Sequence, residues 1–340
     1  HSFPTRRSSD LNIVSLDESD MDSVKARVRM GLSIRPAGVI VYEYDRAGIA
    51  ALEYIPKDMP MVVVGGSFGD GEYQVINAER DGGRWMTMHL LDLGHRTVFH
   101  VGRPEGPTDN TRTNGWRDAL KERGVTAPDP IIVPDDDLEE SVKAGRTLGR
   151  RGDVTAIFAG NDETAIAVIR GLREVGRRVP ADVSVVGFDD RNFGAMWNPA
   201  LTSYTQNFLD MGERSFRMLF EQIQAKRAGD DAPPSQVEVV QGNVVTKEQV
   251  QALQPGMSRQ QIREILGSPL MTSVFHSDRW EYVFTMKRQG VAEQTRKLTV
   301  FFQGDSFVRA QGDEMPSEEE FIAMIEGGGP VEKAAQQELF

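Results

Sequence analysis

The sequence of 340 residues contains no cysteine. This absence excludes disulfide bonds, thiolate metal sites, a cysteine nucleophile and a cysteine that carries a lipid. There is also no run of about 18 apolar residues, so the sequence predicts no membrane-spanning helix. Basic residues are outnumbered, with 39 Lys and Arg against 51 Asp and Glu and a net charge of −12. That balance argues against a nucleic-acid-binding domain.

The first eleven residues, HSFPTRRSSDL, fit neither a signal peptide nor a transit peptide, because they are short and lack an apolar segment. They match, residue for residue, the in-frame translation of a common sequencing-library adapter. We therefore predict that residues 1–11 contribute nothing to the fold. The alternative is a disordered arm or a basic tail that contacts nucleic acid.

Residues 12–240 alternate short apolar segments with helical patterns. Continuous apolar segments such as AGVIVYE and MVVVGG are typical of parallel strands buried on both faces. The alternation predicts a doubly wound α/β architecture. Strands are expected at 12–16, 38–43, 61–65, 97–102, 155–159, 183–188 and 237–240, and helices near 20–33, 80–93, 109–123, 138–151, 161–175 and 207–226.

A second module is predicted at 241–326, where the pattern changes. Thr246 with Gln249 and Ser258 with Gln261 form two S/T-x-x-Q capping boxes, each of which predicts the start of a helix. Alternation in RWEYVFTM and KLTVFF, followed by a Gly-Asp turn before SFVRA, predicts three antiparallel strands. The apolar face of the first two would carry Trp280, Tyr282, Phe284, Met286, Leu298, Val300 and Phe302. Residues 327–340 are predicted to be a flexible tail.

Little in the sequence indicates an enzyme. Residues 65–69 match the G-x-S-x-G pattern of a hydrolase, but a polar, extended segment follows Ser67 where a nucleophile elbow needs a helix. His95 lies beside a glycine that ends a helix, which favours a turn position. Phosphate-binding loops and metal-ligand spacings are absent. We therefore predict no catalytic activity, no cofactor and no metal.

Three polar residues favour a binding site instead. Arg112, Asn161 and Asp189 each follow a predicted strand, and ligands of open α/β sheets bind at the carboxyl ends of the strands. Guanidinium, amide and carboxylate groups together can donate to and accept from the hydroxyl groups of a ligand. For each residue alone, a structural role is an equal alternative, because Asn161 can cap a helix and Asp189 can belong to a turn.

The segments TRTNGWRDALKERG and AIFAGNDETAIAVIRGLREVGRRVPADVSVVGFDD resemble the effector-binding core of the LacI/GalR repressors. The resemblance covers about 12–240 and implies the periplasmic-binding-protein type I fold, with a first lobe of 12–102 plus 207–240 and a second lobe of 103–206. It also implies a small ligand, usually a sugar, in the cleft between the lobes. The effector-binding residues would be Asp81, Arg112, Asn161, Asp189 and Gln206.

The resemblance to the repressors is incomplete at its start. The family's helix-turn-helix, hinge helix, first strand and first helix have no counterpart before residue 12. We therefore expect a gap in the first lobe and no operator binding by this chain. Intact members of the family imply a cytoplasmic homodimer that contacts DNA through the domain missing here.

The segments PGMSRQQIREILGSPL and RWEYVF resemble BamE (the SmpA/OmlA family), over about 241–322. The resemblance implies a lipoprotein at the periplasmic face of the outer membrane, whose partners are β-barrel assembly subunits and phosphatidylglycerol. The matching surface positions are Gln241, Gly242, Asn243, Leu270 and Phe275. Core packing is an equal alternative for the last two. The signal peptide and lipid-bearing cysteine of that family have no counterpart here.

The two resemblances imply different cell compartments. Together with the adapter, this predicts a chimera of two truncated genes joined at about residue 240 by an assembly artefact. The main expected function is effector binding by the first module. A periplasmic sugar-binding protein and an outer-membrane assembly factor are the alternatives.

Overall fold

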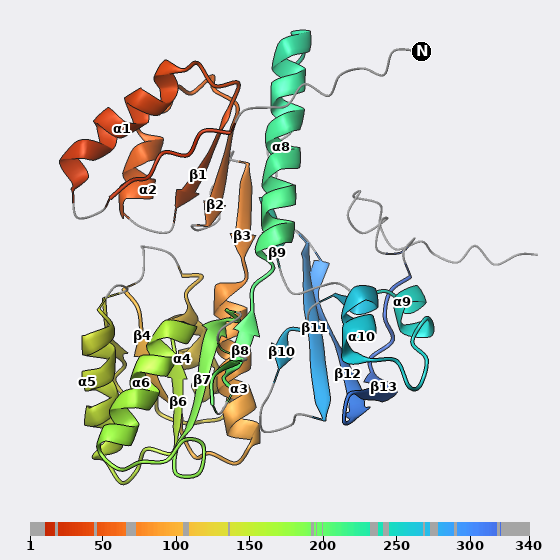
Figure 1. The fold of residues 1–340 in the computed structure, drawn as a ribbon. Helices are drawn as coiled ribbons and strands as arrows, with labels where there is room; N and C mark the ends of the chain where they lie inside the picture. The colour runs from red at the N-terminus through yellow and green to blue at the C-terminus, as the bar shows by residue number, and fades with distance from the viewer. Residues whose placement is uncertain are drawn as a thin grey trace, which may run out of the picture. The chain divides into compact units, whose positions relative to one another are not determined.

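The computed structural model describes residues 11–17, 20–43, 46–65, 73–104, 109–134, 137–191, 194, 196–198, 200–231, 237–240, 245–267, 269–272, 278–288, 291–317 and 320. The chain forms two compact units (Figure 1). The first comprises His1–Asn77, Glu105–Asn110 and Phe208–Val240, and the second comprises Ala78–Pro104, Thr111–Asn207 and Gln241–Phe340.

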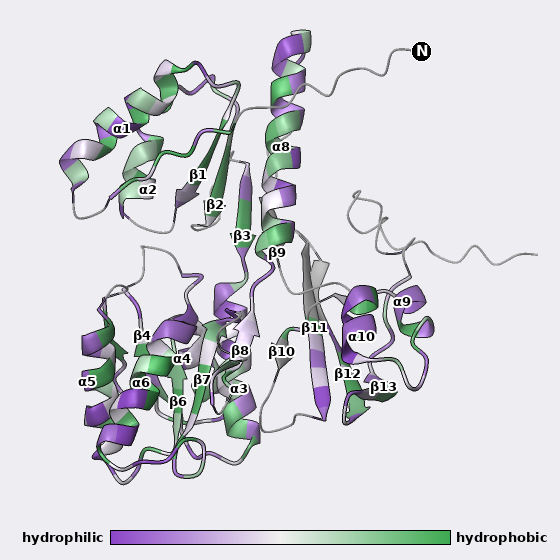
Figure 2. Cartoon of the chain, in the orientation of Figure 1, coloured by the Kyte–Doolittle hydropathy of each residue, from purple (hydrophilic) through white to green (hydrophobic). Residues whose placement is uncertain are grey.

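The first unit is a parallel sheet with helices on both faces. Its strands lie in the order β1 (Val39–Glu43), β2 (Met61–Gly65), β3 (Gln74–Asn77) and β9 (Val237–Val240). Val62 and Val64 pack against α8 (Phe208–Ala228), whereas Met61 packs with α1 (Met21–Ser33) and α2 (Arg46–Leu52). Successive side chains of a strand point to opposite faces, so β2 is apolar along its length, as Figure 2 shows.

The strand expected at 12–16 is wrong. Residues 11–17 have no strand assignment, and Ile13 is 82% exposed. A strand is stabilised by its neighbours in a sheet, and among the described strands β1 pairs only with β2. β1 is therefore an edge strand of the described sheet. On α8, the stacked rings of Phe216 and Phe220 are also largely exposed.

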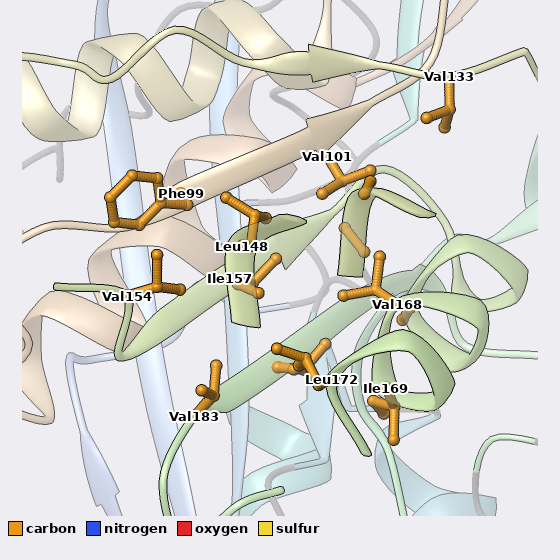
Figure 3. Packing of buried hydrophobic residues seen from close by; sticks show 14 of the residues in the cluster. Phe99, Val101, Val133, Leu148, Val154, Ile157, Val168, Ile169, Leu172 and Val183 are labelled. Atoms are coloured by element: carbon orange, nitrogen blue, oxygen red, sulfur yellow. The ribbon is translucent and has the colours of Figure 1, made fainter. Parts of the chain in front are cut away.

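The second unit is built on a nine-stranded sheet in the order β13-β12-β11-β10-β8-β7-β6-β4-β5. Its parallel part resembles the expected doubly wound pattern, with α5 and α6 on one face and α3 and α4 on the other. Figure 3 shows Leu148, Val168, Ile169 and Leu172 of the first helix pair packed against the sheet. The elements of this part are α3 (Glu79–Asp92), β4 (Phe99–Gly102), α4 (Arg112–Glu122), β5 (Ile131–Ile132), α5 (Leu138–Gly149), β6 (Ala156–Ala159), α6 (Asp162–Glu174), β7 (Ser184–Asp189) and β8 (Thr202–Thr205).

The helices and antiparallel strands expected in the second module are present. Both predicted capping boxes form, at Thr246 and at Ser258, and Gly304 adopts a φ of 62° in the expected turn. Phe284 and Met286 have side chains outside the described residues, while the other predicted apolar-face residues are buried in one core. The elements are α9 (Lys247–Gln251), α10 (Arg259–Leu266), β10 (Met271–Thr272), β11 (Arg279–Arg288), β12 (Val291–Gln303) and β13 (Ser306–Gly312).

The packing divides the chain differently from the predicted lobes. Residues 78–102 were expected in the first lobe but belong to the second unit, because α3 packs with α4 and β4 pairs with β6. The second module was expected to stand apart, yet β10 pairs antiparallel with β8, placing Met271 opposite Tyr204. Leu270 and Val283 complete the core between this sheet and α3. The C-terminal module therefore extends the sheet of the α/β part.

Among the described helices, none has both the length and the apolar character that crossing a membrane requires. The described side chains likewise include no group of three His, Asp or Glu residues arranged to hold a metal ion.

Candidate functional site

The carboxyl ends of the parallel strands bring the predicted polar residues together within the second unit. Arg112 begins α4 after β4, Asn161 precedes α6 after β6, Asp189 ends β7, and Gln206 follows β8. Asp81 lies in the first turn of α3, in the same unit. Asp81 was expected in the first lobe, but the packing places all five residues in the second unit.

Arg112 is at the centre of the site. Its guanidinium donates through Nη1 to the carbonyl oxygen of Gly160 at 2.5 Å and through Nη2 to Oε1 of Glu79 at 3.1 Å. Nη2 also lies 3.1 Å from Oδ1 of Asp189. The guanidinium carbon is 4.0 Å from the centre of the Phe188 ring, so the side chain is held by cation–π attraction as well. Arg112 is therefore buried with its charge paired.

Close helix packing makes the contact with Glu79 possible. α3 and α4 cross at Gly83 and Gly115, where a Cβ atom would collide with the backbone of Arg112 and of Arg80. Outside the buried face, Arg80 pairs with Asp118 at 2.6 Å. The two helices thus approach at their backbones and set Glu79 beside the guanidinium.

Asp189 lies between the side chains of Gln206 and Arg112. Its Oδ1 accepts from Nε2 of Gln206 at 2.5 Å and faces Arg112. Its backbone has a φ of 97°, in the left-handed region that L residues seldom adopt. Asp189, Gln206 and Arg112 therefore lie together at the carboxyl ends of the strands, and a role in ligand binding stays a prediction.

Asn161 has the structural role considered as its alternative. Its Oδ1 accepts from the backbone N–H of Thr164 at 2.8 Å, so it caps α6. The side chain is nonetheless almost fully buried at the same sheet edge as Arg112. The cap uses the amide oxygen of Asn161, so the hydrogens of its Nδ2 group can still donate to a ligand.

Three further residues of this edge were not predicted as site residues. Glu79 and Phe188 contact Arg112 directly. Asp162 is fully buried, and this burial raises its pKa to about 7; the hydrogen bonds from Ser203 and the Arg191 amide act in the opposite direction. Asp162 and Phe188 are sequence neighbours of the predicted site residues Asn161 and Asp189, and this position could have indicated them. Glu79 is far from them in the sequence and reaches the site only through the packing of α3 against α4.

The predicted surface of the second module is described only in part. Gln241, Gly242, Asn243 and Phe275 lie outside the described residues, as does Ser67 of the G-x-S-x-G pattern. Leu270 is 4% exposed and packs in the core with Tyr204 and Val283, which is the alternative stated for it from the sequence.

Comparisons with known proteins agree with the two-module organisation. Residues 87–248 match the family model of a periplasmic binding protein-like domain, and residues 242–312 match the outer membrane protein assembly factor BamE domain. BamE of Polynucleobacter necessarius is 49% identical over 90 residues, which is 26% of this chain and 40% of that protein. The HTH-type transcriptional repressor PurR of Yersinia enterocolitica is 32% identical over 222 residues, 63% of this chain and 65% of that protein.

Solved structures give the same fold for the first module. The transcriptional regulator CelR in complex with cellobiose has a TM-score of 0.56 at 26% identity, covering 66% of this chain and 68% of that chain. A dimeric Lac repressor with a C-terminal deletion has a TM-score of 0.54 at 26% identity, covering 66% of this chain and 82% of that chain. The chain therefore combines a segment similar to periplasmic binding protein-like domains, at 87–248, with a segment similar to BamE domains, at 242–312.

Proposed function

We propose that the first module binds a small polyhydroxylated ligand, most simply a sugar, as the effector-binding core of a transcriptional regulator. The observation that carries this proposal is the buried Arg112–Asp189 pair, stacked on Phe188 at the carboxyl ends of the strands. Donors and acceptors that converge beside an aromatic ring suit a ligand whose hydroxyl groups both give and accept hydrogen bonds. The similar structure of the transcriptional regulator CelR is that of a complex with cellobiose, which supports a sugar as the class of ligand.

The ligand-contacting residues would be Arg112, Asp189 and Gln206, with Asp81 and Asn161 at the border of the site. Calorimetry of the full chain against pentoses, hexoses and disaccharides tests the proposal. Arg112→Ala and Asp189→Ala should each weaken the binding of the best-bound sugar by about 2–5 kcal/mol, because each substitution leaves a buried partner unpaired.

A matched control is available on the same sheet. Arg151 also lies over an aromatic ring, 4.7 Å from the centre of Phe99, and pairs with Asp153. This pair is half exposed and precedes β6, at the opposite ends of the strands. Arg151→Ala should leave sugar affinity unchanged. Equal binding by wild type, Arg112→Ala and Asp189→Ala would show that the site assignment is wrong.

For a regulator of this kind we also propose a cytoplasmic location, self-association, and DNA contact through a domain outside this sequence. Catalysis and a cofactor form no part of the proposal, since the similar proteins are regulators and an assembly factor. A periplasmic sugar-binding protein is the alternative; the calorimetry above would support it equally, and the DNA upstream of codon 12 separates the two.

For the BamE domain we propose the partners that its resemblance implies, which are β-barrel assembly subunits and phosphatidylglycerol at the periplasmic face of the outer membrane. The identity of 49% over 90 residues favours this second function. Sedimentation of the chain with phosphatidylglycerol vesicles, compared with phosphatidylcholine vesicles, tests the lipid contact. Because the two proposed compartments differ, we propose that two genes were joined artificially; amplification across codons 240 and 241 from source DNA should then give no product.

A further inference from the structure

The turn after β7 has an unusual backbone. Asp189 and Asp190 follow each other with φ values of 97° and 50°. Neither is glycine, and a non-glycine residue in this region carries a cost in free energy that the surrounding structure has to offset. The groups that hold this turn therefore determine where the Asp189 carboxylate points.

One buried carboxyl group holds the turn from the side of α6. Oδ2 of Asp162 accepts a hydrogen bond from the backbone N–H of Arg191 at 2.6 Å. Oδ1 accepts from the hydroxyl of Ser203 at 2.6 Å, and that hydroxyl oxygen accepts from the backbone N–H of Asp190 at 3.0 Å. Asp162 thus supports two consecutive backbone amides of the turn, one directly and one through Ser203.

Neighbouring residues complete this arrangement. Thr205 on β8 donates its hydroxyl to Oδ2 of Asp190 at 2.7 Å. Gly187 on β7 leaves room for the carboxyl group, since a Cβ atom there would collide with Oδ1 of Asp162. The turn is consequently bound on one side to α6 and on the other to β8.

We propose that Asp162 is a positioning residue of the ligand site, whose carboxyl group fixes the 189–191 turn and so holds Asp189 against Arg112. The side chain is buried behind the turn and acts through Asp189. Its effect on ligand affinity rests on the proposed function; its effect on the turn does not.

The same carboxyl group makes the turn sensitive to pH. Burial raises the pKa of Asp162 to about 7, and the charges of Asp189 and Asp190 add to this rise. The hydrogen bonds from Ser203 and from the Arg191 amide oppose it. The other charged groups of this edge are Glu163, which follows Asp162 on α6 and lies 3.6 Å from Nε of Arg191, and Arg112, 3.1 Å from Asp189. Around neutral pH, the Arg191 amide should therefore alternate between a charged and a neutral acceptor.

Amide chemical shifts in the full chain test the turn directly. Between pH 5.5 and 8.5, the Arg191 amide proton should titrate with a midpoint near 7 in the wild type and should not titrate in Asp162→Asn. Ser203→Ala removes one bond that lowers the pKa while sparing the Arg191 contact, so its midpoint should rise. An unchanged Arg191 titration in Asp162→Asn would overturn the proposal.

The chain offers an internal control for this experiment. Asp137 caps α5 and accepts from the backbone N–H of Glu140 at 2.9 Å, a carboxylate–amide bond outside the network. Asp137→Asn should alter the Glu140 amide and leave the Arg191 titration as in the wild type. A change at Arg191 in this variant would also contradict the specific role of Asp162.

Sugar affinity supplies the second readout. For the best-bound sugar of the calorimetric panel, Asp162→Asn should bind about tenfold more weakly, which corresponds to about 1.4 kcal/mol, and Asp137→Asn as tightly as the wild type. Equal affinity in Asp162→Asn would overturn the positioning role. If no sugar in the panel binds, the proposed function fails, while the Arg191 amide still decides whether Asp162 fixes the turn.

Discussion

The guanidinium carbon of Arg112 lies 4.0 Å from the centre of the Phe188 ring, and both side chains are buried. Phe188 stacks in turn on Tyr204, with ring centres 4.5 Å apart. Tyr204 packs with Leu270 of the C-terminal module in the same core. A continuous set of packed side chains therefore runs from the candidate ligand site to the C-terminal module.

The first prediction concerns the Arg112–Phe188 pair itself. Water weakens the attraction between a cation and an aromatic ring less when the cation is buried. A double-mutant cycle with Arg112→Ala and Phe188→Leu should therefore give a coupling energy of about 1–2 kcal/mol in urea unfolding. The matched cycle at Arg151 and Phe99, where the arginine is half exposed, should give about 0.5–1 kcal/mol. Equal coupling in the two cycles would contradict the importance of burial.

A second prediction concerns acid stability. His100 is fully buried, and desolvation lowers its pKa to about 4. Its ring is bonded to the Phe158 carbonyl at 2.9 Å and to the Thr113 hydroxyl at 2.9 Å. Between about pH 6.5 and 4 the unfolded chain binds a proton that the folded chain does not, so the free energy of unfolding falls as pH falls.

Urea titrations at several pH values measure this effect. In the wild type, the lowered pKa of His100 should reduce the free energy of unfolding by on the order of 3 kcal/mol between about pH 6.5 and 4. His100→Gln should remove most of this decrease. Asp162 acts in the opposite direction: its pKa is raised, so its stabilising contribution falls as pH rises from about 4 to 7. Measurements in the Asp162→Asn background separate the two groups. An unaltered pH slope in His100→Gln would show that another group is responsible.

Much of the fold follows from periodicity, but short elements do not. The strands at 39–43 and 61–65 and the helix at 162–174 are close to their predicted bounds, because their apolar patterns are long enough to identify. β5 and β10 have two residues each, too few for any pattern, and both depend on pairing with a neighbour. The expected strand at 12–16 has an apolar pattern yet no partner among the described strands.

The site could be predicted where one rule applies to several residues. Arg112, Asn161 and Asp189 each follow an expected parallel strand, so their sheet edge could be predicted from the order of the strands. Gln206 follows β8, which lies outside every expected strand. Glu79 reaches Arg112 only because α3 and α4 approach closely at Gly83, which is a property of tertiary packing. Sequence patterns carry no direct information on such a crossing.

A third prediction concerns the attachment of the BamE domain. The backbone of Leu270 is hydrogen-bonded to Thr205 of β8 and to Glu281 of β11, and its side chain is buried in the same core. Leu270→Ala should therefore lower the free energy of unfolding of the second unit by about 2–4 kcal/mol and speed amide exchange in β8. Leu266→Ala is the matched control, since this leucine is equally buried but belongs to the module's own core. It should destabilise α10 and leave β8 protected. Faster exchange of β8 in both variants, or in neither, would contradict the predicted attachment.

The last prediction concerns self-association through a groove on α5 and α6. The groove has a volume of about 660 Å³, and its apolar floor is bordered by charged side chains. Among its lining residues, Leu138 is 50% exposed and Trp197 38% exposed. An apolar surface bordered by polar groups is the usual composition of a protein interface, and a charge that replaces an apolar side chain there loses its hydration when the surface is buried. Trp197→Glu should therefore weaken association at least about tenfold in sedimentation velocity. Ile132→Glu, at an isoleucine on β5 that is 48% exposed and is not among the residues that line the groove, should sediment as the wild type does. A wild-type chain that remains monomeric at high micromolar concentration, or a Trp197→Glu variant that associates as tightly, would exclude this surface as the interface.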